Sequence, residues 1–189
     1  MSFNECLQAI QDEPLAYLHR QRLVLPAGFD GPQVRRLLNR MVLEGLALQR
    51  SAVPPAPLTA VAQQWVRHWQ QLPYIARLIG AARLMPGLAR GAALLRLAEP
   101  VRRFACYGFG SGGALMLDGS PISVEQVDAA GLNALSSWGG QVPPMLLERL
   151  LLQFSEPVVH LHRQWPLSKP DPALFFLAVQ HARLHPNPD

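Results

Sequence analysis

The sequence contains a single lysine and only two cysteines, and both shortages narrow what the protein can be. Cys6 and Cys106 are too few and too far apart to suggest a disulfide framework, so both thiols are expected to be unpaired in a reducing cytosol. The amino terminus has no basic segment followed by an apolar one, so no signal peptide is predicted.

Long uncharged hydrophobic runs are also missing. The most apolar stretch, 72–98, is interrupted by arginines at four positions, whereas a membrane-spanning helix needs about 20 largely uncharged residues. This stretch is therefore expected to belong to a soluble protein. A composition of 49% apolar and 16% charged residues over 189 positions is typical of a globular chain and predicts one domain covering 1–189.

Helix signals dominate the chain and predict an all-α, or nearly all-α, domain of eight to nine short helices. Ser2 with Glu5, and Ser123 with Gln126, have the form of capping boxes, and Asp171 is followed by a proline that suits a first helical turn. Apolar residues recur at helical spacing after most of these starts. The expected helices are 2–11, 14–24, 31–50, 58–71, 73–84, 86–106, 124–138, 143–154 and 172–184.

Four segments are expected to lie outside these helices. The prolines of 51–57 predict a linker, because each proline removes a hydrogen-bond donor and restricts the residue before it. The glycine-rich run 107–120 predicts a loop that allows one short hairpin around 114–117. The stretch 156–170 fits either a strand or irregular structure, and the tail 185–189 is expected to fray.

The glycines of 108–113 match the G-x-G-x-x-G dinucleotide pattern, but that pattern works only between a strand and a helix amino terminus. Here a helix end is expected before it, so a tight or flexible loop is the favoured interpretation. The pairs His160/His162 and His181/His185 lack a third ligand nearby in sequence, which favours surface or interface histidines over zinc. No cofactor, no metal and no catalytic residue is predicted, and the chain is not expected to be an enzyme.

Arginine is concentrated in the middle of the chain. Between Asp30 and Asp118 only Glu44 and Glu99 oppose eleven arginines, whereas both ends carry more acid than base. Three interpretations remain open: a solvated face, a surface that docks an acidic protein, or a nucleic-acid surface without a recognition motif. The candidate docking residues form the densest run, Arg77, Arg83, Arg90, Arg96, Arg102 and Arg103. Trp65 and Trp69 are expected to form a core stripe rather than a base-stacking platform.

Two patches resemble a known family. The first runs from Pro14 to His19 and is followed shortly after by Leu25-Pro26. The second combines a Gly-Leu helix containing a tryptophan with a proline turn and a leucine-rich helix. Their residues are Pro14, Ala16, Tyr17, Leu18, His19, Gly131, Leu132, Trp138 and Arg149. Their order, their separation and the length of the chain are similar to those of the SctK (YscK-like) proteins of bacterial type III secretion.

The resemblance implies a non-enzymatic cytoplasmic adaptor of the secretion sorting platform, held at the cytosolic face of the inner membrane through the apparatus. Such an adaptor joins the cytoplasmic, forkhead-associated-like domain of the inner-membrane ring protein to the pod (C-ring-like) protein. The alternative expectation is a basic helical protein that binds nucleic acid. In the adaptor interpretation, the arginine run would dock an acidic partner surface.

Overall fold

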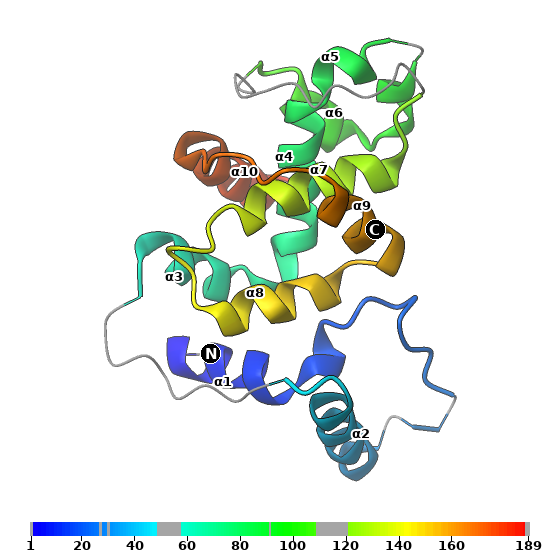
Figure 1. The fold of residues 1–189 in the computed structure, drawn as a ribbon, viewed down its shortest axis with the longest axis vertical. Helices are drawn as coiled ribbons and strands as arrows, with labels where there is room; N and C mark the ends of the chain where they lie inside the picture. The colour runs from blue at the N-terminus through cyan, green and yellow to red at the C-terminus, as the bar shows by residue number, and fades with distance from the viewer. Residues whose placement is uncertain are drawn as a thin grey trace. The chain divides into compact units, whose positions relative to one another are not determined.

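The computed structural model describes residues 2–26, 28–29, 31–48, 58–90, 92–108 and 121–187, and all regular structure in these ranges is helical (Figure 1). The all-α prediction is confirmed. The helices in this part of the chain number ten α-helices and four short 3-10 helices, more than expected. None of them is long and apolar enough to cross a membrane.

The α-helices are α1 (Phe3–Asp12), α2 (Pro32–Gly45), α3 (Ala60–Arg67), α4 (Leu72–Arg83), α5 (Met85–Leu88), α6 (Glu99–Ala105), α7 (Val124–Ser136), α8 (Pro144–Leu150), α9 (Glu156–Gln164) and α10 (Pro172–Leu184). The 3-10 helices are η1 (Pro14–Ala16), η2 (Trp69–Gln71), η3 (Ala93–Arg96) and η4 (Leu151–Gln153). The expected linker 51–57, the hairpin around 114–117, the glycine run from 109 onward and the last two residues of the tail lie outside the described residues.

Three of the predicted helix starts are confirmed by their capping hydrogen bonds. The Ser2 hydroxyl accepts the Glu5 backbone N–H while the Glu5 carboxylate accepts the Ser2 N–H, and Ser123 and Gln126 repeat this arrangement. Asp171 caps α10 by accepting the Leu174 N–H at 3.0 Å. These caps depend on residues three apart, so the sequence alone could specify them.

The helix expected over 14–24 is wrong. Only η1 forms there, and Tyr17, with φ −132° and ψ 0°, leaves the helical conformation. From that position the Tyr17 hydroxyl donates to the Ile10 carbonyl at 2.8 Å, and its ring meets Trp69 edge-on. These contacts with residues outside the segment stabilise a bent chain over a regular helix.

Two further expectations need correction. The helix predicted over 86–106 is divided into α5, η3 and α6, and Ala92 adopts a left-handed φ of 59° between the first two. The stretch 156–170 begins as helix α9 rather than a strand, and only its second part is irregular. Asn133 holds that part, because its side chain donates to the Pro166 carbonyl and accepts the Ser168 N–H.

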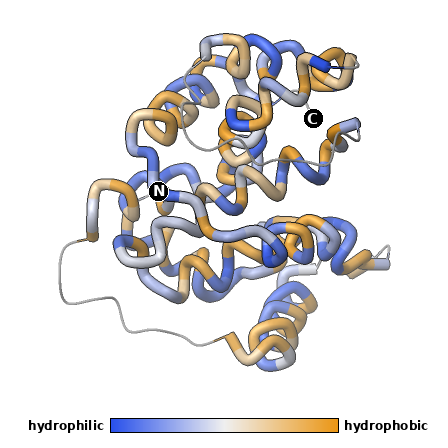
Figure 2. Tube along the Cα trace, turned by 45° about the horizontal axis from the view of Figure 1, so that its top comes forward, coloured by the Kyte–Doolittle hydropathy of each residue, from blue (hydrophilic) through white to orange (hydrophobic). Residues whose placement is uncertain are grey.

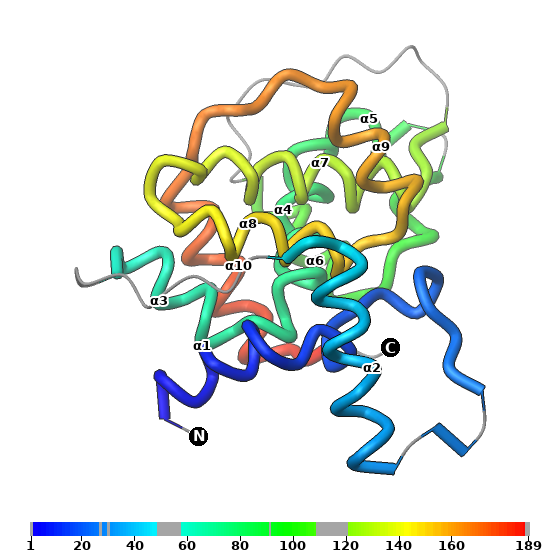
Figure 3. The backbone as a smooth tube through the Cα atoms, turned by 60° about the horizontal axis from the view of Figure 1, so that its bottom comes forward, coloured from blue at the N-terminus to red at the C-terminus, as the bar shows by residue number. Residues whose placement is uncertain are grey.

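The described chain divides into two compact units that alternate along the sequence. The first unit takes its residues from 1–70 and 139–156, and the second from 71–138 and 157–189. The single domain predicted for 1–189 stays a prediction. In the first unit, α2 runs across the end of α1, where η1 follows it (Figure 3).

The second unit is built around α4, which is apolar and buried on nearly all sides, as expected for a central helix. Helix α7 crosses it so closely that a Cβ added at Gly131 would lie 1.8 Å from the Ala76 carbonyl oxygen. A Cβ at Gly80 would likewise lie 1.9 Å from the Val127 carbonyl oxygen. The absence of side chains at these two positions therefore sets the α4–α7 contact.

Candidate functional site

The six arginines predicted to dock a partner all belong to the second unit, but they differ in exposure. The exposed ones are Arg90, Arg96 and Arg103, and the half-buried ones are Arg77, Arg83 and Arg102. The structure therefore brings these side chains into one unit without making them equivalent.

Arg77 forms a two-pronged contact with a carboxylate. Its Nε donates to Asp128 Oδ1 at 2.9 Å and its Nη2 donates to Asp128 Oδ2 at 3.0 Å, which joins α4 to α7. The side chains are 29% and 14% exposed, so water screens this pair less than a surface pair. Asp128 therefore helps to hold two helices together.

Two more of the six interact with carboxylates. Burial lowers the pKa of the Arg83 guanidinium from its usual value, and the nearby Asp171 carboxylate opposes that shift. Arg103 donates to Glu99 at 2.6 Å one helical turn away on α6, where both side chains are largely exposed. Arg90 and Arg96 are thus the exposed members of the run for which the structure records no ion pair within its described residues.

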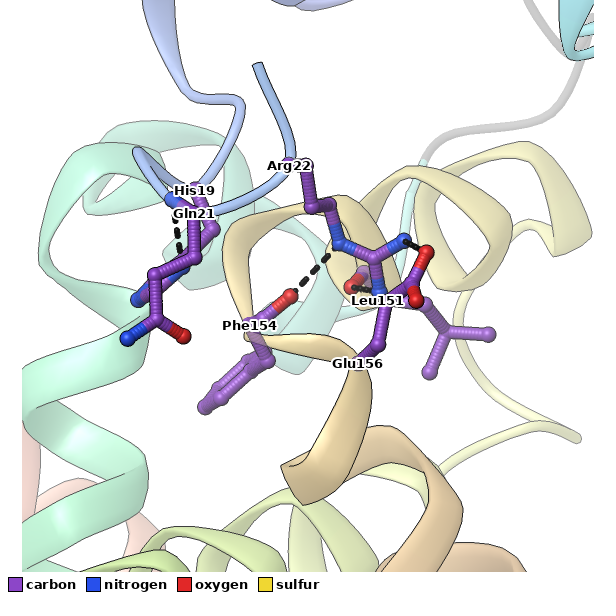
Figure 4. Close-up of polar contacts among 6 residues, drawn as sticks. All are labelled: His19, Gln21, Arg22, Leu151, Phe154 and Glu156. Carbon is purple, nitrogen blue, oxygen red and sulfur yellow. Dashed lines mark hydrogen bonds and ion pairs between the residues drawn. The ribbon is translucent and has the colours of Figure 1, made fainter. Parts of the chain in front are cut away.

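The first family-like patch and part of the second, over 120 positions apart in the sequence, meet in the first unit. The His19 N–H donates to the Leu152 carbonyl at 2.8 Å. Just beyond it, Arg22 donates to the Leu151 and Phe154 carbonyls at 3.2 and 2.7 Å (Figure 4). These carbonyls end the α8–η4 helical segment, where a cation is favoured by the helix dipole. Arg22 is a residue whose role the sequence did not reveal.

Tyr17 and Arg149 connect the same two patches in the core of the first unit. Arg149 is fully buried, and its guanidinium donates to the Met145 and Gln11 carbonyls. Burial raises the pKa of the Tyr17 phenol above its usual value, and the Arg149 charge beside it opposes that rise. Both family-like residues therefore serve the internal structure of this unit.

The remaining family-like residues also have identifiable positions. Pro14 is buried at the start of η1, Leu18 is half-buried, and Ala16 is exposed. Gly131 allows the close α4–α7 contact, Leu132 is fully buried, and Trp138 packs against Phe175 of α10. Most of this resemblance consequently reports packing, which is why it carries no chemistry of its own.

The tryptophans and two of the histidines considered in the sequence are buried in the structure. Trp65 and Trp69 are buried, which confirms the core stripe. His162 and His181 are buried too, contrary to the surface placement expected for them, and the His181 ring Nε2 lies 3.0 Å from the Pro100 carbonyl oxygen. No group of three or more metal-binding side chains occurs in the described ranges. The dinucleotide-like pattern falls largely outside those ranges.

An exposed apolar face on α2 is the surface that sequence reasoning missed. The helix was predicted, but its apolar stripe does not face the core, since Leu37 is 56% and Met41 57% exposed. Asn39 and Leu43, on the other side, are the buried residues of α2. The polar residue Asn39 is buried because its side chain accepts the Leu15 N–H. The sequence shows the asparagine but not this partner, so it could not indicate which side of α2 is buried.

Comparisons with known proteins give a consistent result. A family model described as "Bacterial type III secretion apparatus protein (OrgA_MxiK)" matches residues 7–184. The protein named "Oxygen-regulated invasion protein OrgA" is 29% identical to the chain in Salmonella typhimurium strains LT2, SL1344 and 14028s. Each alignment covers 95% of this chain and 88% of the relative. No solved structure gives a significant match.

Proposed function

This chain belongs to the OrgA_MxiK family of bacterial type III secretion apparatus proteins, and from that membership we propose that it is a non-enzymatic adaptor of the sorting platform. The adaptor joins the cytoplasmic, forkhead-associated-like domain of the inner-membrane ring protein to the pod (C-ring-like) protein. It therefore works at the cytosolic face of the inner membrane. The observation that carries the proposal is the family match over residues 7–184.

The use of the polar residues supports this role. Arg22, Arg77 and Asn133 all bind groups within their own unit, so they hold helices and connecting segments in place. A protein that must present surfaces to two partners needs such internal fixation, because interface geometry is lost when the presenting elements move.

The arginine run supplies one such surface. Arg90 and Arg96 are exposed and lie in the segment between α5 and α6, so they are the residues of the run best placed to meet acidic side chains. Arg77 contributes less to this surface because its charge already faces Asp128. Complementary charge at such a site sets orientation and association rate more than final affinity.

The adaptor role is tested by mixing the full-length chain with the ring protein's cytoplasmic domain and the pod protein of the same secretion system. Size-exclusion chromatography should recover a complex of all three, and no complex of the two partners alone. Recovery of the chain by itself, with neither partner bound, would overturn the proposal.

The arginine surface is tested separately with the double variant Arg90→Glu and Arg96→Glu. Its association rate with one of the two partners should fall by about tenfold at low salt, and less at high salt, because exposed charges are screened there. The matched control is Arg183→Glu, an exposed arginine on α10 outside the run, which should bind as the native chain does. An unchanged association rate at low salt would remove Arg90 and Arg96 from the interface.

The nucleic-acid alternative is decided with the same protein. A nucleic-acid binder would shift a generic duplex in a gel, with an affinity that falls steeply between about 50 and 200 mM salt. If the duplex does not shift at any protein concentration, the nucleic-acid alternative is excluded and the adaptor proposal stands.

A further inference from the structure

Helix α2 presents its apolar side outward. Leu37 and Met41 are one turn apart and more than half exposed, and Val34 and Leu38 beside them are half-buried. These four residues are called the α2 outer face. Two large, well-exposed apolar side chains on one helical turn form a patch of the kind that marks interaction sites.

The inner side of α2 is fixed to the first unit. Asn39 Oδ1 accepts the Leu15 N–H at 3.0 Å, and Leu43 is buried beside it. If the helix rolled to bury the α2 outer face, Asn39 would leave its partner and the Leu15 N–H would lose its acceptor. The outward orientation is therefore a property of the fold.

The charges around the α2 outer face specify what binds there. Arg35, Arg36 and Arg40 are exposed on the same helix, and Glu44 is the acidic residue of α2. Arg35 is three positions from Leu38 and Arg40 is three positions from Leu37, so one arginine flanks the apolar centre on each side, and Glu44 lies three positions from Met41. Arginines on both flanks match an apolar stripe with acidic flanks, the arrangement of an amphipathic helix that docks along another helix.

We propose that the α2 outer face binds an acidic amphipathic helix of another protein of the secretion apparatus. This inference rests on the proposed adaptor function, which supplies the class of partner, and adds the residues and the chemistry. Leu37 and Met41 insert between the partner's apolar side chains, and Arg35 and Arg40, which flank them, meet its carboxylates. The unbranched Met41 side chain adapts its shape to that surface.

The hydropathy of the residues along α2 agrees with a helix that has both an apolar and a polar side. In Figure 2, hydrophobic and hydrophilic positions alternate along the tube of α2. The α2 outer face belongs to the first unit, whereas Arg90 and Arg96 belong to the second. Each unit thus carries its own candidate surface, as an adaptor with two partners requires.

The test uses the full-length chain with Leu37→Glu and Met41→Glu, singly and together, against the ring protein's cytoplasmic domain and the pod protein as separate probes. Both residues are exposed, so the variants should fold and melt as the native chain does. Affinity for one probe should fall at least about tenfold, because each glutamate places a charge in the apolar centre of the interface. The matched control is Leu184→Glu, at a leucine 76% exposed on α10, which should leave the affinity unchanged.

Two further measurements identify the partner's chemistry. The variant Arg35→Glu with Arg40→Glu should bind the same probe more weakly, and its binding should depend less on salt. A photo-crosslinker placed at position 41 should attach to a segment of the probe in which acidic residues flank an apolar stripe. Attachment to a basic or wholly polar segment would overturn the proposal.

Two other results distinguish an error in the α2 outer face from an error in the adaptor function. If the native chain binds a probe and the Leu37 and Met41 variants bind it equally well, this surface is wrong and the adaptor function stands. If the native chain binds neither probe, the adaptor function fails and this inference fails with it. Sedimentation with phosphatidylglycerol vesicles, or self-association, that Leu37→Glu abolishes would overturn the assignment to a protein partner.

Discussion

At the scale of single residues, several polar side chains of this protein connect segments within one unit. Arg77 and Asp128 join two helices, and Arg22 binds two carbonyls at the end of a third helical segment. Each of these residues is charged and could be mistaken in the sequence for part of a binding surface. Their hydrogen bonds in the structure define them instead as contacts within a unit.

The Arg77–Asp128 pair should contribute measurably to stability. In a double-mutant cycle with Arg77→Met and Asp128→Asn, we expect a coupling energy of about 1–2 kcal/mol, since the contact is two-pronged and partly shielded from water. The exposed pair Arg103–Glu99 is the control and should give less than about 0.5 kcal/mol. Equal coupling in the two cycles, measured by urea unfolding, would contradict the structural role assigned to Arg77.

Stability should also depend on pH through a buried histidine. Burial and the Arg163 charge lower the pKa of His162 from 6.5, so the unfolded chain takes up a proton there at a higher pH than the folded chain does. The free energy of unfolding should therefore fall between about pH 7 and pH 5, because the unfolded state binds more protons in that window. In His162→Leu this fall should be smaller.

The control for that measurement is His160→Leu, two positions away at an exposed site, which keeps His162 in place and should therefore retain the fall. His181, whose pKa is also lowered, mainly by burial, should account for part of the slope that remains in His162→Leu. An identical slope in the native chain and in His162→Leu would show that His162 is not the titrating group.

At the scale of helices, the contact between α4 and α7 depends on two positions without side chains. Gly131→Ala should lower the free energy of unfolding by about 3 kcal/mol, because the new methyl group meets the Ala76 carbonyl and the backbones must separate. Gly140→Ala is the control, as nothing lies within 4 Å of its Cβ position, and it should change stability by less than about 0.5 kcal/mol. Similar melting temperatures for the two variants would refute the close approach.

Helix positions and helix faces differ in how far they could be predicted. The starts of α1, α7 and α10 follow from caps that involve residues three apart, and the sequence specified all three correctly. The outward face of α2 could not be predicted, because periodicity identifies an apolar stripe without saying whether anything covers it. The segment 14–24 was assigned wrongly for a related reason, since Trp69 and Leu152 bind its residues from elsewhere in the chain.

At the scale of the whole molecule, the alternation of the two units along the sequence has a direct consequence. A chain ending at Trp138 loses α8 and η4 from the first unit, and nearly all of α9 and the whole of α10 from the second. The lost core residues include Leu146, Leu150 and Phe175. Burial of each of these side chains contributes roughly 1.5–3 kcal/mol to the free energy of folding. We expect this fragment to lack a cooperative thermal transition by circular dichroism.

The control truncation ends at His185 and removes only residues beyond α10, so it should melt as the full-length chain does. A cooperative transition in the fragment ending at Trp138 would mean that one unit folds without its carboxy-terminal helices. That result would also show which unit can be produced alone for binding experiments.

The sequence by itself determined the helical class, most helix starts, the tryptophan core stripe and the resemblance to a secretion family, because caps, periodicity and short motifs are local properties of the chain. The tertiary structure alone decided that Arg77 binds Asp128, that the segment around Tyr17 bends, and that the apolar side of α2 faces outward. Those outcomes depend on contacts between residues far apart in the sequence. The free energy of these contacts exceeds the conformational preference that each segment has on its own. The surface proposed to bind a partner is therefore visible only in the folded chain.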